Sequence, residues 1–271
     1  MKYWTEYKGH SPNIQGIRNK FDNNIYTFDI ETTSYYILNN KVYSGCSYDK
    51  LNEKDRKNAI VQTTMYIWMF SINDQVYYGR TWDEFKRFIT IIDNFIDEKK
   101  IVFVHNLAFE FQFLSGEFNF CNVVARKPHK PMKAELSDYN IEFRCSYMMS
   151  NCSLSNLAKV YQLPVNKKVG DLDYTKIRTS ITKLDDVELG YCEYDCLVVY
   201  YFIKKELETY ETVMNLPITS TSHVRRELKN LVMKDYHYKS KVYRAINIDP
   251  HIYNLLIQAF QGGYTHAIHM F

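Results

Sequence analysis

The sequence lacks three features that would indicate a membrane span, secretion or paired cysteines. It has no run of about 18 apolar residues, no signal peptide and no Cys-x-x-Cys pair. We therefore expect no contact with a membrane and no disulfide framework. We expect reduced, mostly buried thiols in a cytoplasmic protein. The six cysteines concerned are Cys46, Cys121, Cys145, Cys152, Cys192 and Cys196.

A strong net charge, internal repeats and low-complexity tracts are also missing. The 34 basic and 31 acidic residues leave a net charge of +3, so a nucleic-acid site would have to be a local groove. Hydrophobic residues make up 46% of the 271 residues, enough for a sizeable core. The length fits one large domain, or a domain of about 200 residues with an appendage. The 24 tyrosines and 16 phenylalanines are suited to stacking on bases.

The first candidate site is a pair of carboxylates, Asp29 and Glu31, at the end of a strand predicted over residues 25–30. Residues i and i+2 of a strand lie on one face, so the two acids are close together and repel each other. A divalent cation would relieve that repulsion, and carboxylate oxygens suit Mg²⁺ and Mn²⁺. The alternative is a strand end that exposes two acids to solvent.

Strands and helices alternate along most of the chain, which predicts a mixed α/β sheet flanked by helices, with a helical C-terminal extension. We expect residues 1–24 and 36–58 to be coil or loop. Strands are expected at 25–30, 60–70, 74–79, 101–104 and within 120–145. Helices are expected from Thr81 to about 97, after His105–Asn106, at 154–163, from Thr182 or Asp185 to about 210, and at 219–235 and 249–260.

Two more acids follow in positions typical of functional residues. Glu110 lies early in the helix that follows the apolar strand 101–104, and the carboxyl end of a central strand is a favoured place for a site. Asp195 lies four residues after Tyr191 on an otherwise apolar helix, where a buried acid needs a charge partner. The alternatives are a Glu110 that faces solvent near a helix N-terminus, and an exposed Asp195 beside a packed tyrosine.

These motifs together resemble the 3′–5′ exonuclease domain of B-family DNA polymerases, in the tyrosine subclass of the DEDD superfamily. The protein-primed polymerases of small bacteriophages are the most similar group. Five segments in order, covering about residues 25–265, carry the resemblance: Phe28-Asp-Ile-Glu-Thr32, His105-Asn-Leu-Ala-Phe-Glu110, Gly170-Asp-Leu-Asp-Tyr174, Tyr191-Cys-Glu-Tyr-Asp195 and Phe260-Gln-Gly-Gly-Tyr264. Glu110 stands where the family has Asp, and Phe260 where it has Tyr.

The resemblance implies a ribonuclease H-like fold with three parts. Residues 1–24 would be a lead-in, 25–212 the exonuclease domain, and 213–271 a helical linker toward an absent polymerase domain. The polymerase motifs Asp-x-x-Ser-Leu-Tyr and Asp-Thr-Asp do not occur in the sequence. We therefore expect no polymerase activity from this chain alone.

The resemblance also assigns roles to individual residues. Two Mg²⁺ or Mn²⁺ ions would be held by Asp29, Glu31, Asp195 and Glu110. Tyr191 would orient the attacking water, and Lys168 or Lys167 would neutralise charge on the scissile phosphate. The residues implied to hold the DNA strand are Thr32, Asn106, Phe109, Phe113, Tyr174, Gly262 and Gly263. The basic turn Arg126-Lys-Pro-His-Lys130 could contact the phosphates of the strand or could be a solvated loop. We favour the solvated loop.

The predicted function is metal-dependent 3′–5′ hydrolysis of single-stranded DNA ends, the proofreading part of a protein-primed polymerase. The expected partners are a DNA 3′ end, a polymerase domain or subunit, and a terminal protein. If the chain is of bacteriophage origin, the expected location is the cytoplasm of the host cell. Two alternatives stay open. One is a DEDD-type exoribonuclease, since nothing in the motifs reads the 2′-hydroxyl. The other is a non-catalytic module that binds single strands or a partner.

Overall fold

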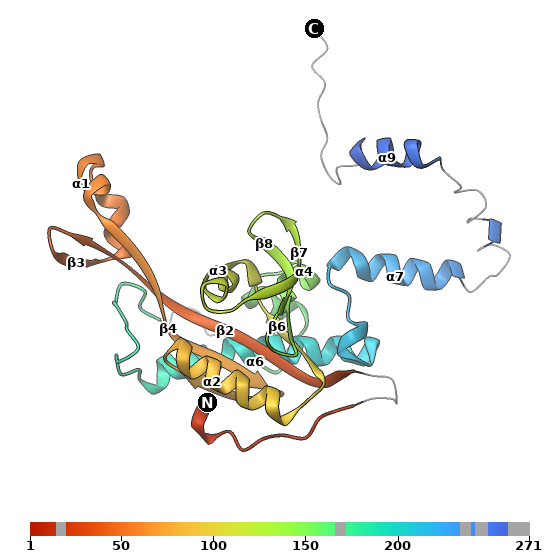
Figure 1. Cartoon of the computed structure of the whole chain (residues 1–271), viewed down its shortest axis with the longest axis horizontal. Coiled ribbons are helices and arrows are strands. Elements are labelled where there is room, and N and C mark those ends of the chain that lie inside the picture. The colour runs from red at the N-terminus through yellow and green to blue at the C-terminus, as the bar shows by residue number, and fades with distance from the viewer. Residues whose placement is uncertain (15–19, 166–171, 234–239, 242–248, 260–271) are drawn as a thin grey trace, which may run out of the picture. The chain divides into compact units, whose positions relative to one another are not determined.

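A computed structural model of the chain describes residues 1–14, 20–165, 172–233, 240–241 and 249–259 (Figure 1). The chain divides into two compact units, Met1–Ser220 and Thr221–Phe271. The first unit contains the sheet and all the acids singled out above, and the second is helical. No helix in the described parts of the chain combines the length and the apolar character needed to cross a bilayer.

A mixed nine-stranded sheet organises the first unit. Its strand order is β1-β5-β4-β2-β6-β9-β8-β7, with β3 on the edge of β2. The pairs β1–β5, β2–β6 and β6–β9 are parallel and the others antiparallel, which confirms the predicted mixed sheet. The strands are β1 (Lys2–Tyr3), β2 (Phe21–Leu38), β3 (Lys41–Ser44), β4 (Ile60–Ile72), β5 (Gln75–Gly79), β6 (Lys99–Val104), β7 (Phe120–Lys127), β8 (Lys130–Leu136) and β9 (Ile141–Cys145).

The two longest helices of this unit begin where their caps predict. The side chain of Thr81 accepts a hydrogen bond from the backbone of Glu84 at the start of α2 (Trp82–Phe95). Asp185 and Glu188 cap the start of α6 (Asp186–Tyr210) in the same reciprocal way. The remaining helices are α1 (Glu53–Asn58), α3 (Leu107–Glu117), α4 (Ser146–Ser150) and α5 (Leu154–Val160).

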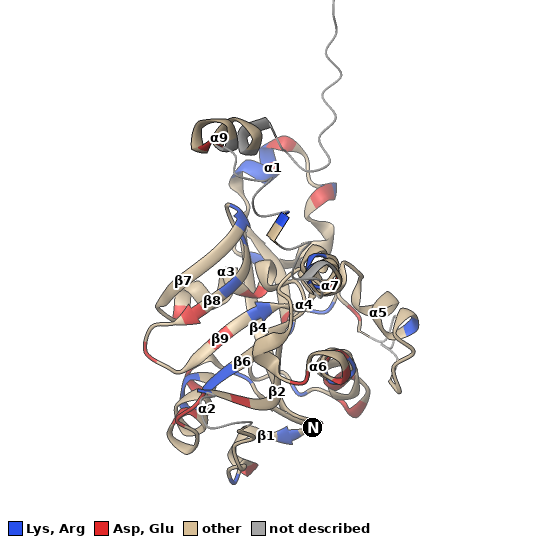
Figure 2. Ribbon diagram, turned by 90° about the vertical axis from the view of Figure 1, so that its right-hand side faces the viewer, with Lys and Arg blue, Asp and Glu red and all other residues tan. Residues whose placement is uncertain are grey.

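The two faces of β2 are packed differently, with α2 and α6 on opposite sides of the sheet (Figure 2). Tyr26, Phe28 and Ile30 belong to the same apolar core as α2, and the ring of Phe28 stacks on that of Phe85 at 4.7 Å. The alternate side chains face α6, where Thr27 donates a hydrogen bond to the carbonyl of Cys196. Asp29 and Glu31 lie on this second face because side chains alternate along a strand.

Several predicted boundaries are wrong. The strand expected at 25–30 extends over 18 residues, and its outer half pairs with β3 and β4. The loop expected at 36–58 contains β3, a 3₁₀ segment and α1, and the coil expected at 1–24 contains β1 and the start of β2. β1 is held by pairing with the distant strand β5, which local patterns do not predict, whereas β3 pairs with the end of β2 through a tight turn at Asn39 and Asn40. Cys46 and Cys121 are exposed rather than buried.

The second unit confirms the predicted helical C-terminal region. Its described residues include the helices α7 (Ser220–Met233) and α9 (Pro250–Ala259). The side chains of Val224, Leu228 and Leu231 recur at helical spacing on α7, and each is more than half exposed.

Candidate active site

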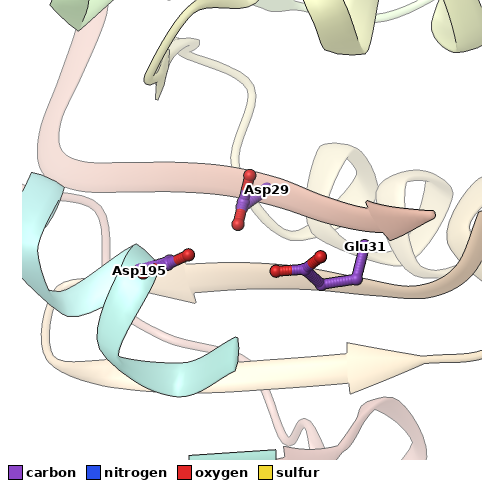
Figure 3. A group of neighbouring side chains, drawn as sticks. All are labelled: Asp29, Glu31 and Asp195. Carbon is purple, nitrogen blue, oxygen red and sulfur yellow. The ribbon is translucent and has the colours of Figure 1, made fainter. Parts of the chain in front are cut away.

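Strand β2 presents Asp29 and Glu31 toward α6 from the second face of the sheet (Figure 3). The strand pairs with β4 as Glu31↔Ile67 and then as Thr32↔Met65, so a bulge in β4 follows Glu31. Pairing with β6 ends at Phe28, one residue before Asp29. The edge of β2 is therefore open on that side at the two acids, which leaves room for other groups beside them.

Helix α6 brings Asp195 to the same place. Asp195 is 4% exposed, and it lies one residue before Cys196, whose carbonyl accepts from Thr27. One carboxylate oxygen from each of Asp29, Glu31 and Asp195 lies within 4.8 Å of the other two. Three acids this close repel one another strongly unless a cation or protons intervene. Figure 3 shows the three side chains converging on one point between β2 and α6.

Glu110 completes the acidic group from α3. Asn106, in the left-handed conformation with φ 68°, makes the turn from β6 into this helix, and its carbonyl accepts from the backbone of Phe109. Glu110 is 3% exposed and hydrogen-bonds with Asp29. Its Oε2 atom is buried and has no hydrogen-bond partner among the described residues. Burial raises the pKa of Glu110, and the charge of Glu31 adds to this effect.

Two tyrosines border the acids. The hydroxyls of Tyr174 and Tyr191 lie 3.2 Å apart. Burial raises the pKa of Tyr191 to about 12, and the nearby carboxylates contribute to the increase. The phenol is therefore protonated at neutral pH and acts as a hydrogen-bond donor rather than a base. Tyr174 is 57% exposed, and its backbone carbonyl accepts from the thiol of Cys46.

A cavity of about 200 Å³ joins these side chains. Seven of the residues predicted for the site line it: Asp29, Glu31, Phe109, Glu110, Tyr174, Tyr191 and Asp195. The four acids in its lining are buried or half-buried, whereas Phe109 and Tyr174 are exposed.

No role is predicted from the sequence for other lining residues, among them His105, Leu154 and Val199. The Nδ1 atom of His105 lies 3.1 Å from the hydroxyl of Ser146. The position of His105 at the end of a central strand was the one signal available for it. Leu154 and Val199 are apolar helix residues, and nothing in their local pattern separates a cavity wall from a core.

Other predicted residues do not line the cavity. Thr32 follows the bulge, Asn106 is exposed at the helix start, and Phe113 lies one turn along α3 with its ring 5.4 Å from that of Phe109. The basic residues of the β7–β8 turn are exposed and also lie off the cavity wall. Lys167, Lys168, Phe260, Gly262 and Gly263 lie outside the described residues.

No family model and no curated protein matches this sequence. Solved structures of phi29 DNA polymerase do match. The complex with single-stranded DNA has a TM-score of 0.60 at 15% identity and covers 90% of this chain and 40% of the polymerase chain. The ternary complex with primer-template DNA and incoming nucleotide has a TM-score of 0.61 at 14% identity, and the match covers 91% of this chain and 40% of the polymerase chain. This chain thus spans about 40% of the length of phi29 DNA polymerase and shares the fold of that part.

Proposed function

We propose that this chain is a metal-dependent 3′–5′ exonuclease that acts on single-stranded DNA ends. The observation that carries the proposal is the convergence of Asp29, Glu31 and Asp195 within 4.8 Å, with Glu110 and Tyr191 on the wall of the same cavity. The likeness to a polymerase solved with single-stranded DNA and with primer-template DNA supports the choice of substrate.

The donor set fits hard divalent cations. It offers only carboxylate oxygens at close range, and the buried Oε2 of Glu110 adds a further oxygen without a protein partner. Asp29, Glu31, Asp195 and Glu110 would hold two Mg²⁺ or Mn²⁺ ions. When bound, the ions would supply the positive charge that makes a water nucleophilic at neutral pH and stabilises the leaving oxygen.

The residues of the chain would orient the attacking water and offer stacking surfaces for the strand. The Tyr191 hydroxyl, protonated and adjacent to the acids, would hold the attacking water together with Glu31. The rings of Phe109 and Tyr174 offer faces for unpaired bases, each worth about 1–3 kcal/mol. The replacement of Asp by Glu at position 110 is compatible with this reading, because the longer side chain still lines the cavity with a buried oxygen, Oε2, that has no protein partner among the described residues.

In its cellular setting, we infer that the activity is the proofreading part of a B-family polymerase of the protein-primed type. The partners would be a DNA 3′ end, a polymerase domain or subunit, and a terminal protein. Lys168, Thr32, Asn106, Phe113, Gly262 and Gly263 keep the roles that the resemblance implies for them.

The test is digestion of 5′-labelled single-stranded DNA and of RNA of the same sequence, each with Mg²⁺, Mn²⁺ or EDTA. We expect a ladder of DNA products that shortens from the 3′ end with either metal, and none with EDTA. Preferential digestion of RNA would favour the exoribonuclease. Binding of the strand without turnover in either metal would favour the non-catalytic module and contradict the proposal.

A further inference from the structure

Arg178 is a buried cation next to the candidate site that neither the resemblance nor the proposed chemistry uses. It is 3% exposed and lies four residues after Tyr174. Its Nε and Nη2 atoms donate to Oε1 of Glu188, at 3.0 and 2.5 Å. Its Nη1 atom donates to the carbonyl of Asp173 at 2.7 Å, and its guanidinium lies over the ring of Tyr66.

These contacts join three elements that carry site residues. The backbone N–H of Arg178 donates to the hydroxyl of Thr33, two residues beyond Glu31 on β2. The Asp173 carbonyl belongs to the residue directly before Tyr174. Glu188 lies on α6, three residues before Tyr191 and on the same side of the helix.

Glu188 makes a second contact, at the start of α6. Its other carboxylate oxygen, Oε2, accepts from the backbone N–H of Asp185 and so caps α6. One carboxylate therefore fixes the start of the helix that carries Tyr191 and Asp195, and also holds the guanidinium that fixes the segment of Tyr174. This is a rigid connection, because the planar guanidinium donates in directions that its geometry sets.

We propose that Arg178 is a positioning residue that holds Tyr174 against Tyr191 over the acids. The inference depends on the proposed function for its kinetic consequence. Tyr174 is 57% exposed, so little packing holds its side chain, and its hydroxyl lies 3.2 Å from that of Tyr191. Its orientation therefore depends on its backbone, and Arg178 anchors that backbone from both sides, through Asp173 and through Thr33.

A double-mutant cycle between Arg178 and Tyr174 tests the proposal. The variants are Arg178→Leu, Tyr174→Ala and the combination, with kcat and KM measured on a single-stranded oligonucleotide below the melting temperature of every variant. Arg178→Leu should lower kcat about 10-fold with little change in Mn²⁺ affinity, in line with lost orientation of one group. In the Tyr174→Ala background the same change should lower kcat less than about twofold, since nothing remains to be positioned. Arg178→Lys should be intermediate, because an ammonium lacks the fixed fork.

Arg144→Leu is the matched control. Arg144 is also buried, donates to Glu142 at 2.5 Å and to the carbonyl of Val213, and none of the three residues lines the cavity. Its loss should lower the melting temperature in the same way and leave kcat unchanged. An equal loss of kcat in Arg144→Leu, or an equal effect of Arg178→Leu in both Tyr174 backgrounds, would overturn the proposal.

Hydrogen exchange separates this inference from the proposed function. If the wild-type protein hydrolyses no strand, the proposed function fails, and exchange of the amides in residues 172–178 still reports on the anchor. Faster exchange there in Arg178→Leu, with α2 unchanged, is the expected result. Unchanged exchange would contradict the anchoring role.

Discussion

Strand β2 carries two acidic sites whose surroundings differ in kind: the fully buried Asp22 and the half-buried pair Asp29 and Glu31. Asp22, at the start of β2, is fully buried and is surrounded by donors. Its carboxylate accepts from the backbones of Asn13 and Asn24 and from the hydroxyl of Tyr26, and it lies 3.8 Å from Nε2 of His10. Burial alone would raise the pKa of Asp22, but these hydrogen bonds lower it to about 2.

Seven residues further on, Asp29 is surrounded by other acids. Glu31 and Asp195 approach within 4.8 Å, and Glu110, which hydrogen-bonds with Asp29, is so placed that burial raises its pKa. The comparison separates two uses of a buried carboxylate. Where the protein provides donors, the charge is a structural element, and where it provides more acids, the arrangement is suited to a cation from solution.

The largest effect is expected when one acid is removed from the group formed by Asp29, Glu31, Asp195 and Glu110. Asp29→Ala should lower nuclease turnover by at least about 100- to 1,000-fold, because each group that stabilises transition-state charge is worth about that much. The melting temperature without metal should stay the same or rise, since one repulsion is lost. Asp195→Ala should behave in the same way. Turnover close to the wild-type rate in purified Asp29→Ala would rule out the carboxylate metal site.

The same type of change at Asp22 should have the opposite outcome. Asp22→Asn removes a charged acceptor from several buried donors and should lower the free energy of unfolding by about 1–3 kcal/mol. Turnover per folded molecule should be unchanged. Urea denaturation measures the stability, and active-site titration of the folded fraction measures the turnover. A loss of turnover without a loss of stability would contradict a structural role for Asp22.

The contribution of the Asp22 carboxylate to the free energy of unfolding should depend on pH. The pKa of Asp22 lies at about 2 in the folded protein and near 3.8 without its partners, so its contribution to stability is fully present above about pH 4. That contribution is lost as the pH falls through 2. The difference in unfolding free energy between wild type and Asp22→Asn should therefore narrow between pH 4 and pH 2. A constant difference would contradict the low pKa.

Substitution of Tyr191 tests whether the acidic site needs a hydrogen-bond donor to orient the attacking water. Tyr191→Phe should keep metal and strand binding and slow hydrolysis by about 10- to 100-fold, the effect of one hydrogen bond that orients the water in the transition state. Measurement of kcat alongside the Kd for a single strand separates the two. Weaker strand binding with an unchanged rate would make Tyr191 a packing or stacking residue.

Access is the last difference between the two groups. The Asp22 group is closed, whereas the second group opens into a cavity with the exposed rings of Phe109 and Tyr174. A duplex end must unpair at a cost of a few kcal/mol before its bases reach those rings. Single-stranded DNA should therefore be shortened about tenfold faster than a blunt duplex, or more. Equal rates, or early release of the 5′ label as a mononucleotide, would contradict this expectation.

Much of the site could be predicted from the sequence because its signals are local. The i, i+2 spacing of Asp29 and Glu31 on a strand puts them on one face. The i, i+4 spacing of Tyr191 and Asp195 on a helix does the same, and the caps at Thr81 and Asp185 mark where α2 and α6 begin. These patterns depend on bonds within a few residues, so they survive without knowledge of the fold.

The tertiary structure decided which of these groups meet. Only the packing of α3 against β8 and β9 brings Glu110 to Asp29, and only the path of residues 172–178 brings Arg178 between Thr33 and Glu188. Two partners of Asp22, His10 and Asn13, come from a segment that the sequence predicts as coil, and His105 reaches the cavity because β6 ends there. The contacts of Glu110 with Asp29 and of Arg178 with Thr33 join residues far apart in the chain, and their energies depend on burial and partners that no local pattern contains.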